Sequence, residues 1–189
     1  MNSERDTATD LLRRLLAGER GQLPLHLAML LEKASPLDSG DDHYRQILPP
    51  ELAELRLSQE TAEEIMATLC AEVSRNPDEA LIAAISFTGS GLATKTAVAV
   101  LTDRPRPLTM GELDASLSLV TEYLPYHLAE DPEFLPKADL ERLVQLTNEL
   151  QNTSEGEGET DKDRAARISI GHHAPQLLRR LTQLGGNPN

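Results

Sequence analysis

Apolar side chains recur at every third or fourth residue along much of this 189-residue chain, and this spacing restricts its fold more than any other feature. Such spacing places side chains on one face of an α-helix. No segment alternates between apolar and polar residues for long enough to predict a strand. We therefore expect an all-α protein, either a multi-helix bundle or a short HEAT-like α-solenoid of antiparallel helix pairs. The clearest apolar stripe consists of Ala62, Ile65, Met66, Leu69 and Val73.

The residue types available for a core agree with this fold class. Only 3% of the residues are aromatic, and the chain has no Trp, so Leu, Ala, Ile and Val must supply most of the core. These residues favour helix-on-helix packing over a β-sandwich.

Capping signals predict where several helices begin. Thr109 and Glu112 have the spacing of a capping box, and Pro125 inside the following apolar stripe predicts a kink or a restart near Leu124. A second helix is expected to begin at Asn76, with Asn76 as the N-cap and Pro77 in the first turn. Weaker helical patterns cover residues 9–17, 24–33, 50–57 and a segment that starts near residue 137.

A change of composition predicts the domain organisation. Residues 152–163 read NTSEGEGETDKD, which is typical of a flexible acidic linker. The linker would separate an acidic helical domain (1–151) from a basic C-terminal helical segment (164–184), followed by a disordered tail (185–189). Gly171 and Pro175 are the expected breaks in the C-terminal helix. Whether that helix docks on its own body or on another protein is left open.

The stretch ISFTGSGLATKT, residues 85–96, comes close to a phosphate-binding loop. Gly89, Lys95 and Thr96 match that motif, but Thr94 occupies the position of its second glycine. No predicted strand precedes the stretch, as the motif requires. We therefore interpret the Gly89–Thr96 segment as a turn between two helices, with nucleotide binding as the alternative.

Histidines are the next candidates for chemistry. His127 and Glu130 are three residues apart and could supply two metal ligands, but two ligands do not make a site. His172 and His173 are adjacent, so on a helix they point in different directions. We expect no metal, no cofactor and no catalytic residue.

The net charge of the chain limits the kinds of molecule that it can bind. The chain carries a formal charge of −13, which repels nucleic-acid phosphates and anionic lipids. The single cysteine, Cys70, falls in an apolar stripe and cannot form an internal disulfide, and no apolar run is long enough to span a membrane. We expect a cytoplasmic protein that binds neither nucleic acid nor membrane.

The sequence is thus typical of a non-catalytic protein–protein interaction module: an adaptor, a regulator, or an inhibitor of the immunity-protein type. Its partner would be a basic or mixed-charge protein, and homo-oligomerisation remains open. An enzyme, or a nucleotide- or metal-binding protein using Gly89–Thr96 or His127 and Glu130, is the alternative. The candidate partner-binding residues are Glu60, Glu63, Glu64, Arg167, Arg179 and Arg180.

Overall fold

The computed structural model describes residues 2–34, 46–103, 106–151 and 159–185, and in these residues it is all-helical, with no strand. The helices are α1 (Asn2–Leu16), α2 (Leu23–Lys33), α4 (Pro50–Ala53), α5 (Gln59–Arg75), α6 (Glu79–Ser86), α7 (Gly91–Thr102), α8 (Met110–Glu130), α9 (Lys137–Leu150) and α10 (Asp161–Gly185). The expected all-α fold is confirmed.

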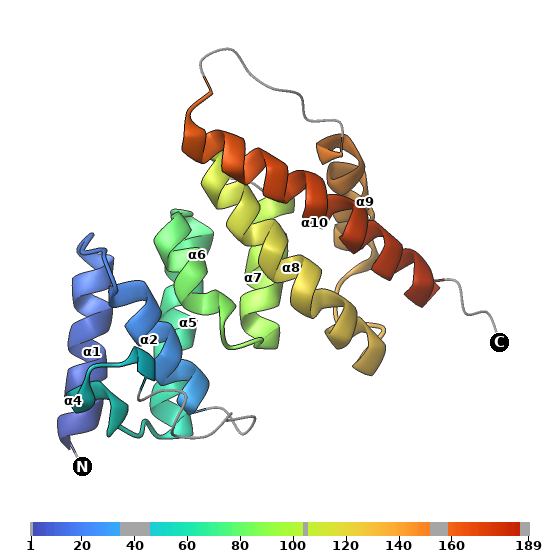
Figure 1. Cartoon of the computed structure of the whole chain (residues 1–189). Helices are drawn as coiled ribbons and strands as arrows, with labels where there is room; N and C mark the ends of the chain where they lie inside the picture. The colour runs from blue at the N-terminus through green and yellow to red at the C-terminus, as the bar shows by residue number, and fades with distance from the viewer. Residues whose placement is uncertain (1, 35–45, 104–105, 152–158, 186–189) are drawn as a thin grey trace.

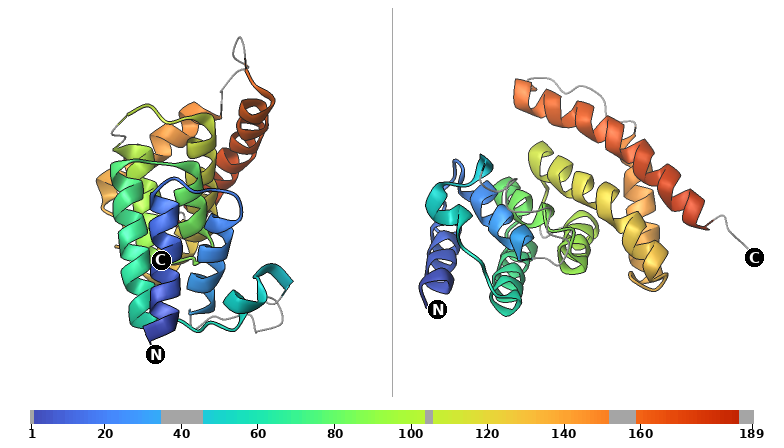
Figure 2. Two further views of the ribbon diagram at one scale, coloured as in Figure 1. Left: turned by 90° about the vertical axis from the view of Figure 1, so that its left-hand side faces the viewer. Right: turned by 60° about the horizontal axis from the view of Figure 1, so that its bottom comes forward.

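The helices are arranged broadly in chain order from one end of the molecule to the other (Figure 1). α1 packs on α2 and α5, α2 packs on α6, and α5 packs on α7. α8 contacts α6 and α7, while α10 lies along α8 and also contacts α9. The right-hand view of Figure 2 shows the same order, with α1 at one end of the molecule and α9 and α10 at the other.

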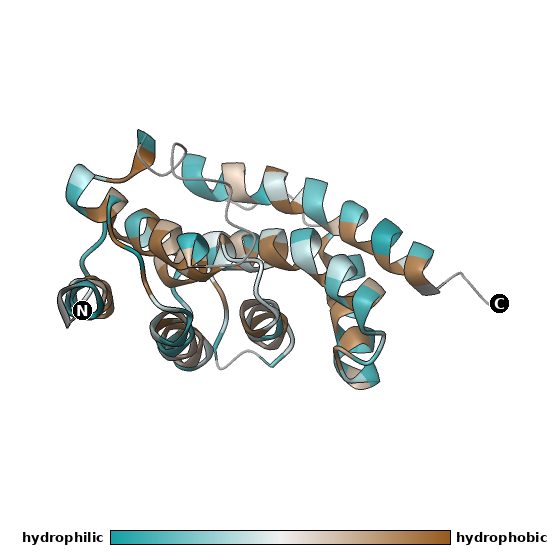
Figure 3. Ribbon diagram, turned by 90° about the horizontal axis from the view of Figure 1, so that it is seen from below, coloured by the Kyte–Doolittle hydropathy of each residue, from teal (hydrophilic) through white to brown (hydrophobic). Residues whose placement is uncertain are grey.

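The predicted apolar stripes face the core. All five residues of the α5 stripe are buried, and so are all the stripe residues of α8 except the half-buried Met110. Figure 3 shows apolar residues on the helix sides that face neighbouring helices and hydrophilic residues on the outer sides. Cys70 is a buried free cysteine, and burial raises the pKa of its thiol, which keeps it protonated.

One of the two predicted helix starts is correct. The capping box is present at the start of α8: the Glu112 backbone N–H donates to Thr109 Oγ1 at 3.2 Å, and the Thr109 N–H donates to Glu112 Oε2 at 2.9 Å. The predicted start at Asn76 is wrong, because Asn76 closes α5. Asp78 caps α6 instead, since its carboxylate accepts the free backbone N–H groups of the first turn.

The helix α8 does not restart at Pro125; it continues through this residue to Glu130. Proline has no N–H to donate to the carbonyl four residues earlier, which belongs to Thr121. The guanidinium of Arg180, on α10, donates to that carbonyl at 2.9 Å. A tertiary hydrogen bond therefore satisfies the acceptor that Pro125 leaves without its helical partner.

The expected breaks in the C-terminal segment are also wrong. α10 passes through both Gly171 and Pro175. Apolar packing holds it together: its residues Ile170, Ala174 and Leu177 are completely buried against the body. The C-terminal helix thus docks on its own chain.

The boundaries predicted for that segment differ from those of the structure. α10 spans Asp161–Gly185, so residues 161–163 of the predicted linker and residue 185 of the predicted tail are helical. Residues 152–158 of the linker and residues 186–189 of the predicted tail lie outside the described residues. No helix in the described ranges is both long enough and apolar enough to cross a membrane.

Candidate functional site

The turn between α6 and α7, residues 87–90, is tightly constrained. Gly89 adopts a left-handed conformation, with φ = 57°. A Cβ atom on Gly89 would lie 2.7 Å from Cε1 of Tyr123, a ring on α8. Ser90 then caps α7 by accepting a hydrogen bond from the Ala93 backbone N–H at 3.1 Å. The turn therefore requires glycine for both its backbone conformation and its contact with α8.

The structure brings together two candidates that the sequence treats separately. His127 Nε2 donates a hydrogen bond to the Gly89 carbonyl at 3.0 Å. The His127 ring stacks on Phe134, with ring centroids 4.6 Å apart. Lys95 Nζ lies 4.6 Å from the centroid of the same Phe134 ring. His127 thus ties the turn to the C-terminal part of α8, and Phe134 lies between His127 and Lys95 of α7.

This geometry differs from that of a phosphate-binding loop. Thr94, at the position of the second glycine, is completely buried, and its hydroxyl donates to the Ser90 carbonyl at 3.1 Å. A helix, α6, precedes the turn in place of the strand that the motif requires. The Lys95 ammonium lies over the Phe134 ring.

In the part of the chain that the structure describes, the geometry gives no metal-binding cluster either. The Nε2 atom of His127 is already bonded to the Gly89 carbonyl, and Glu130 is exposed at the end of α8. A hydrogen bond with Glu130 raises the pKa of the neighbouring Tyr126. Within the described ranges, no group of three or more His, Cys, Asp or Glu residues could hold a metal ion.

Aromatic residues gather around this turn. The chain contains three Tyr and two Phe, and four of these five surround the turn: Phe87, Tyr123, Tyr126 and Phe134. Tyr44 lies outside the described residues. Phe87 is 45% exposed and Tyr126 is 58% exposed, although rings of this size are usually buried. The four described aromatic residues therefore lie together around one surface turn, and two of them, Tyr123 and Phe134, also pack against the core.

An open cavity of about 440 Å³, which we call the aromatic pocket, lies on the α8 side of the turn. Its described lining includes three aromatic rings and two carboxylates but no positively charged side chain. Burial raises the pKa of Tyr123, and the nearby Glu122 and Glu32 raise it further, so the phenol stays neutral. The lining residues are Glu32, Phe87, Thr88, Gly89, Glu122, Tyr123 and Tyr126.

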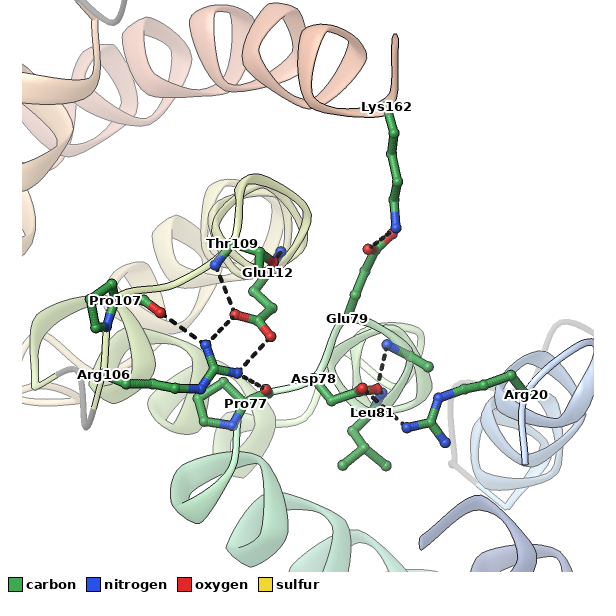
Figure 4. A network of polar contacts seen from close by, with 11 residues as sticks. Arg20, Pro77, Asp78, Glu79, Leu81, Arg106, Pro107, Thr109, Glu112 and Lys162 are labelled. Carbon is green, nitrogen blue, oxygen red and sulfur yellow. Dashed lines mark hydrogen bonds and ion pairs between the residues drawn. The ribbon is translucent and has the colours of Figure 1, made fainter. Parts of the chain in front are cut away.

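The opposite end of α6 is fixed by ion pairs, which helps to set the direction of the helix that leads into Phe87 and the turn (Figure 4). Asp78 accepts a hydrogen bond from Arg20, in the loop between α1 and α2, at 3.1 Å. Glu79 accepts one from Lys162, on α10, at 2.6 Å. Segments from both ends of the chain therefore meet at the start of α6.

A third cation contacts the same end of α6. Arg106 donates to the Pro77 carbonyl at 2.7 Å and to Glu112 Oε1 at 2.8 Å. Burial alone would raise the pKa of Glu112, but the hydrogen bonds from Arg106 and Thr109 outweigh burial and lower it. The charged carboxylate of α8 is thus tied through Arg106 to the loop before α6.

The acidic residues predicted to bind a partner lie together on α5. Glu60, Glu63 and Glu64 are all exposed. Glu64 accepts a hydrogen bond from Arg5, on α1, at 2.7 Å. Glu63 lines a second pocket on the other side of the α6–α7 turn.

The predicted basic residues contact their own chain. Arg167 donates to Glu159 at 2.8 Å, Arg180 donates to the Thr121 carbonyl, and Arg179 Nε donates to the Pro175 carbonyl at 3.3 Å. The structure therefore does not bring these arginines together with the acidic face of α5.

Sequence reasoning missed the aromatic pocket. One signal was available, because four of the five aromatic residues fall within positions 87–134. In a chain with so few aromatic residues, their clustering in one part of the sequence indicates that they serve one site. Compared with known proteins, the chain matches no family model, no curated protein and no solved structure.

Proposed function

We propose that this protein is a non-catalytic protein–protein interaction module that binds a basic or mixed-charge segment of a partner through the aromatic pocket. The observation that carries the proposal is the placement of Phe87, Tyr123 and Tyr126 beside Glu32 and Glu122 at one surface site. Such a module would act as an adaptor, a regulator or an inhibitor.

The chemistry of the pocket suits a positively charged side chain. An Arg or Lys side chain is attracted to the face of an aromatic ring, and nearby carboxylates strengthen that attraction. Exposed aromatic residues are also frequent among the residues that dominate the binding energy of interfaces.

Charge outside the pocket supports the same kind of partner. The net charge of −13 would speed the approach of a basic protein and disfavour nucleic acid and anionic membranes. In this proposal, Glu60, Glu63 and Glu64 on α5 contribute to the long-range attraction, while the pocket supplies the close contacts. The buried thiol of Cys70 is compatible with a reducing compartment such as the cytoplasm.

The proposal includes a finer description of the architecture. Packing between successive helices, such as α5 with α6 and α7 with α8, supports a short HEAT-like solenoid of antiparallel pairs. The C-terminal basic helix, α10, would then close one end of the array. A flexible acidic link would join it to the preceding helices.

A peptide-binding experiment tests the function. The probe is a fluorescein-labelled peptide of Gly-Arg-Ser repeats, measured by fluorescence anisotropy at low salt. We expect Glu122→Gln and Tyr126→Ala each to weaken binding about fivefold, because each removes one attractive contact with the guanidinium. Glu60→Gln removes an equal charge outside the pocket and should weaken binding less than about twofold. Equal losses for Glu122→Gln and Glu60→Gln, or no binding by the wild type, would contradict the proposal.

The enzymatic alternative has less support, because Thr94 is buried and His127 is bonded to the Gly89 carbonyl. A ligand that binds only the native state raises its melting temperature. We expect no change in Tm with ATP, GTP or divalent metals. A rise in Tm that Lys95→Ala abolishes would favour a nucleotide-binding protein instead.

A further inference from the structure

A second cavity opens on the other side of the α6–α7 turn. Its volume is about 250 Å³, and we call it the apolar pocket because aliphatic side chains form most of its wall. Leu92, at the start of α7, is 48% exposed at this site. The lining residues on which the argument depends are Leu31, Ala62, Met66, Thr88 and Leu92, with Glu63 the one acidic side chain.

The two pockets are neighbours, because Thr88 lines both of them. The turn that separates them is held in place from within. The Thr88 hydroxyl donates to the Ile85 carbonyl at 3.2 Å, and the Gly89 carbonyl accepts from His127. An extended segment that crosses this turn would meet an aromatic, acidic pocket on one side and an aliphatic pocket on the other.

The apolar pocket has the size of an aliphatic side chain. An apolar cavity of about 150 Å³ can hold a benzene molecule, so a cavity of about 250 Å³ has room for a leucine or methionine side chain. Removing such a side chain from water improves affinity by about tenfold or more. Charge is concentrated in the other pocket, where Glu32 and Glu122 face the aromatic rings.

We infer that the partner's binding segment combines an arginine, which enters the aromatic pocket, with a leucine-sized aliphatic residue, which enters the apolar pocket. The inference rests on the proposed function, because it identifies the kind of segment that the same turn recognises. Arginine fits better than lysine because its flat guanidinium stacks on aromatic rings and binds carboxylates through two donors.

A set of labelled peptides tests the inference. One series carries an arginine and a leucine separated by two to five Gly or Ser residues. Matched peptides replace the leucine or the arginine by serine, and one replaces the arginine by lysine. With the best spacing, we expect Leu→Ser in the peptide to weaken binding to the wild-type protein about tenfold.

A variant of the protein tests whether the leucine of the peptide gains its affinity in the apolar pocket. Leu92→Ser changes a half-exposed residue, so the fold should be retained, and circular dichroism checks this. We expect Leu92→Ser to weaken the arginine–leucine peptide about fivefold and the peptide without leucine less than twofold. Glu122→Gln should weaken both peptides equally.

The possible results separate the inference from the proposed function. If peptides with and without leucine bind equally, and both respond to Glu122→Gln, the inference is wrong while the function stands. If no arginine peptide binds, both are wrong. If the lysine peptide binds as tightly as the arginine peptide, the assignment to arginine is wrong.

Methyl NMR of the free protein provides a further check. The Leu92 and Met66 methyl signals should shift with the arginine–leucine peptide and not with the peptide that lacks leucine. The inference is overturned if these methyl groups already contact residues 35–45 or a second copy of the chain in the free protein, and the peptide leaves them unchanged.

Discussion

At the scale of single residues, Gly89 shows how one position sets the shape of the site. Its φ of 57° and the approach of Tyr123 leave no room for a side chain. We expect Gly89→Ala to lower the free energy of unfolding by about 1–2 kcal/mol from the left-handed backbone alone, with an added loss from the contact. Urea unfolding followed by circular dichroism measures this change.

Gly171→Ala is the matched control, because Gly171 lies in α10 with open space where a Cβ would be. Alanine in a helix interior should raise the free energy of unfolding by about 0.5–1 kcal/mol. If Gly89→Ala leaves the free energy of unfolding unchanged, or raises it as Gly171→Ala is expected to do, the tight packing of Gly89 on Tyr123 is contradicted.

Asp114 is a residue whose environment opposes its charge. Its Oδ1 atom is buried without a hydrogen-bond partner, and so is Nδ1 of His173 on α10. Burial raises the pKa of Asp114, while a hydrogen bond with Ser169 and the charge of His173 partly offset that rise. The native state therefore holds the Asp114 proton more tightly than the unfolded state. The corresponding stability is present at low pH and is lost as the pH rises through the raised pKa.

Asp114→Asn tests that reading. Asparagine has no charge to desolvate, and its amide can donate a hydrogen bond. We expect the variant to be more stable than the wild type by about 1 kcal/mol near neutral pH, with the difference shrinking toward about pH 4. Urea unfolding at both pH values measures it. A variant that is less stable than the wild type near neutral pH would show that the ionised carboxylate is well accommodated.

At the scale of helices, the sequence predicted which segments are helical, but it did not predict that α8 and α10 continue through their internal prolines. Local spacing determines the stripes of α5 and α8, so both could be predicted. Pro125 and Pro175 predicted interruptions because each removes a backbone donor. A helix can continue through a proline when a residue far away in sequence donates the missing hydrogen bond, as Arg180 does for the Thr121 carbonyl. The pocket was missed for a similar reason, because it forms only where α6, α8 and α2 meet.

The Arg180 contact can be isolated by a double-mutant cycle. Arg180→Met should cost about 1 kcal/mol of stability, because it leaves the Thr121 carbonyl without its donor. In a Pro125→Ala background, the alanine N–H can donate to that carbonyl, so the same substitution should cost much less. Thermal or urea unfolding of the four proteins gives the coupling energy. Equal costs in the two backgrounds would mean that Arg180 acts through packing alone.

At the scale of the whole molecule, the fold holds α6, its turn and α8 in fixed relation. Arg20 and Lys162 join segments from both ends of the chain to the start of α6, and Arg106 ties the loop before α6 to α8. The four aromatic residues that the structure describes gather at the other end of that helix. A scaffold of this kind presents a preformed surface, which lowers the ordering cost of binding.

The most direct test of this account is NMR of the aromatic side chains during titration with the Gly-Arg-Ser peptide at low salt. The account predicts saturable shifts of the Phe87, Tyr123 and Tyr126 ring signals, at lower affinity in Glu122→Gln. Ring signals that stay fixed, while the peptide shifts only residues around Glu60 and Glu64 on α5, would contradict it.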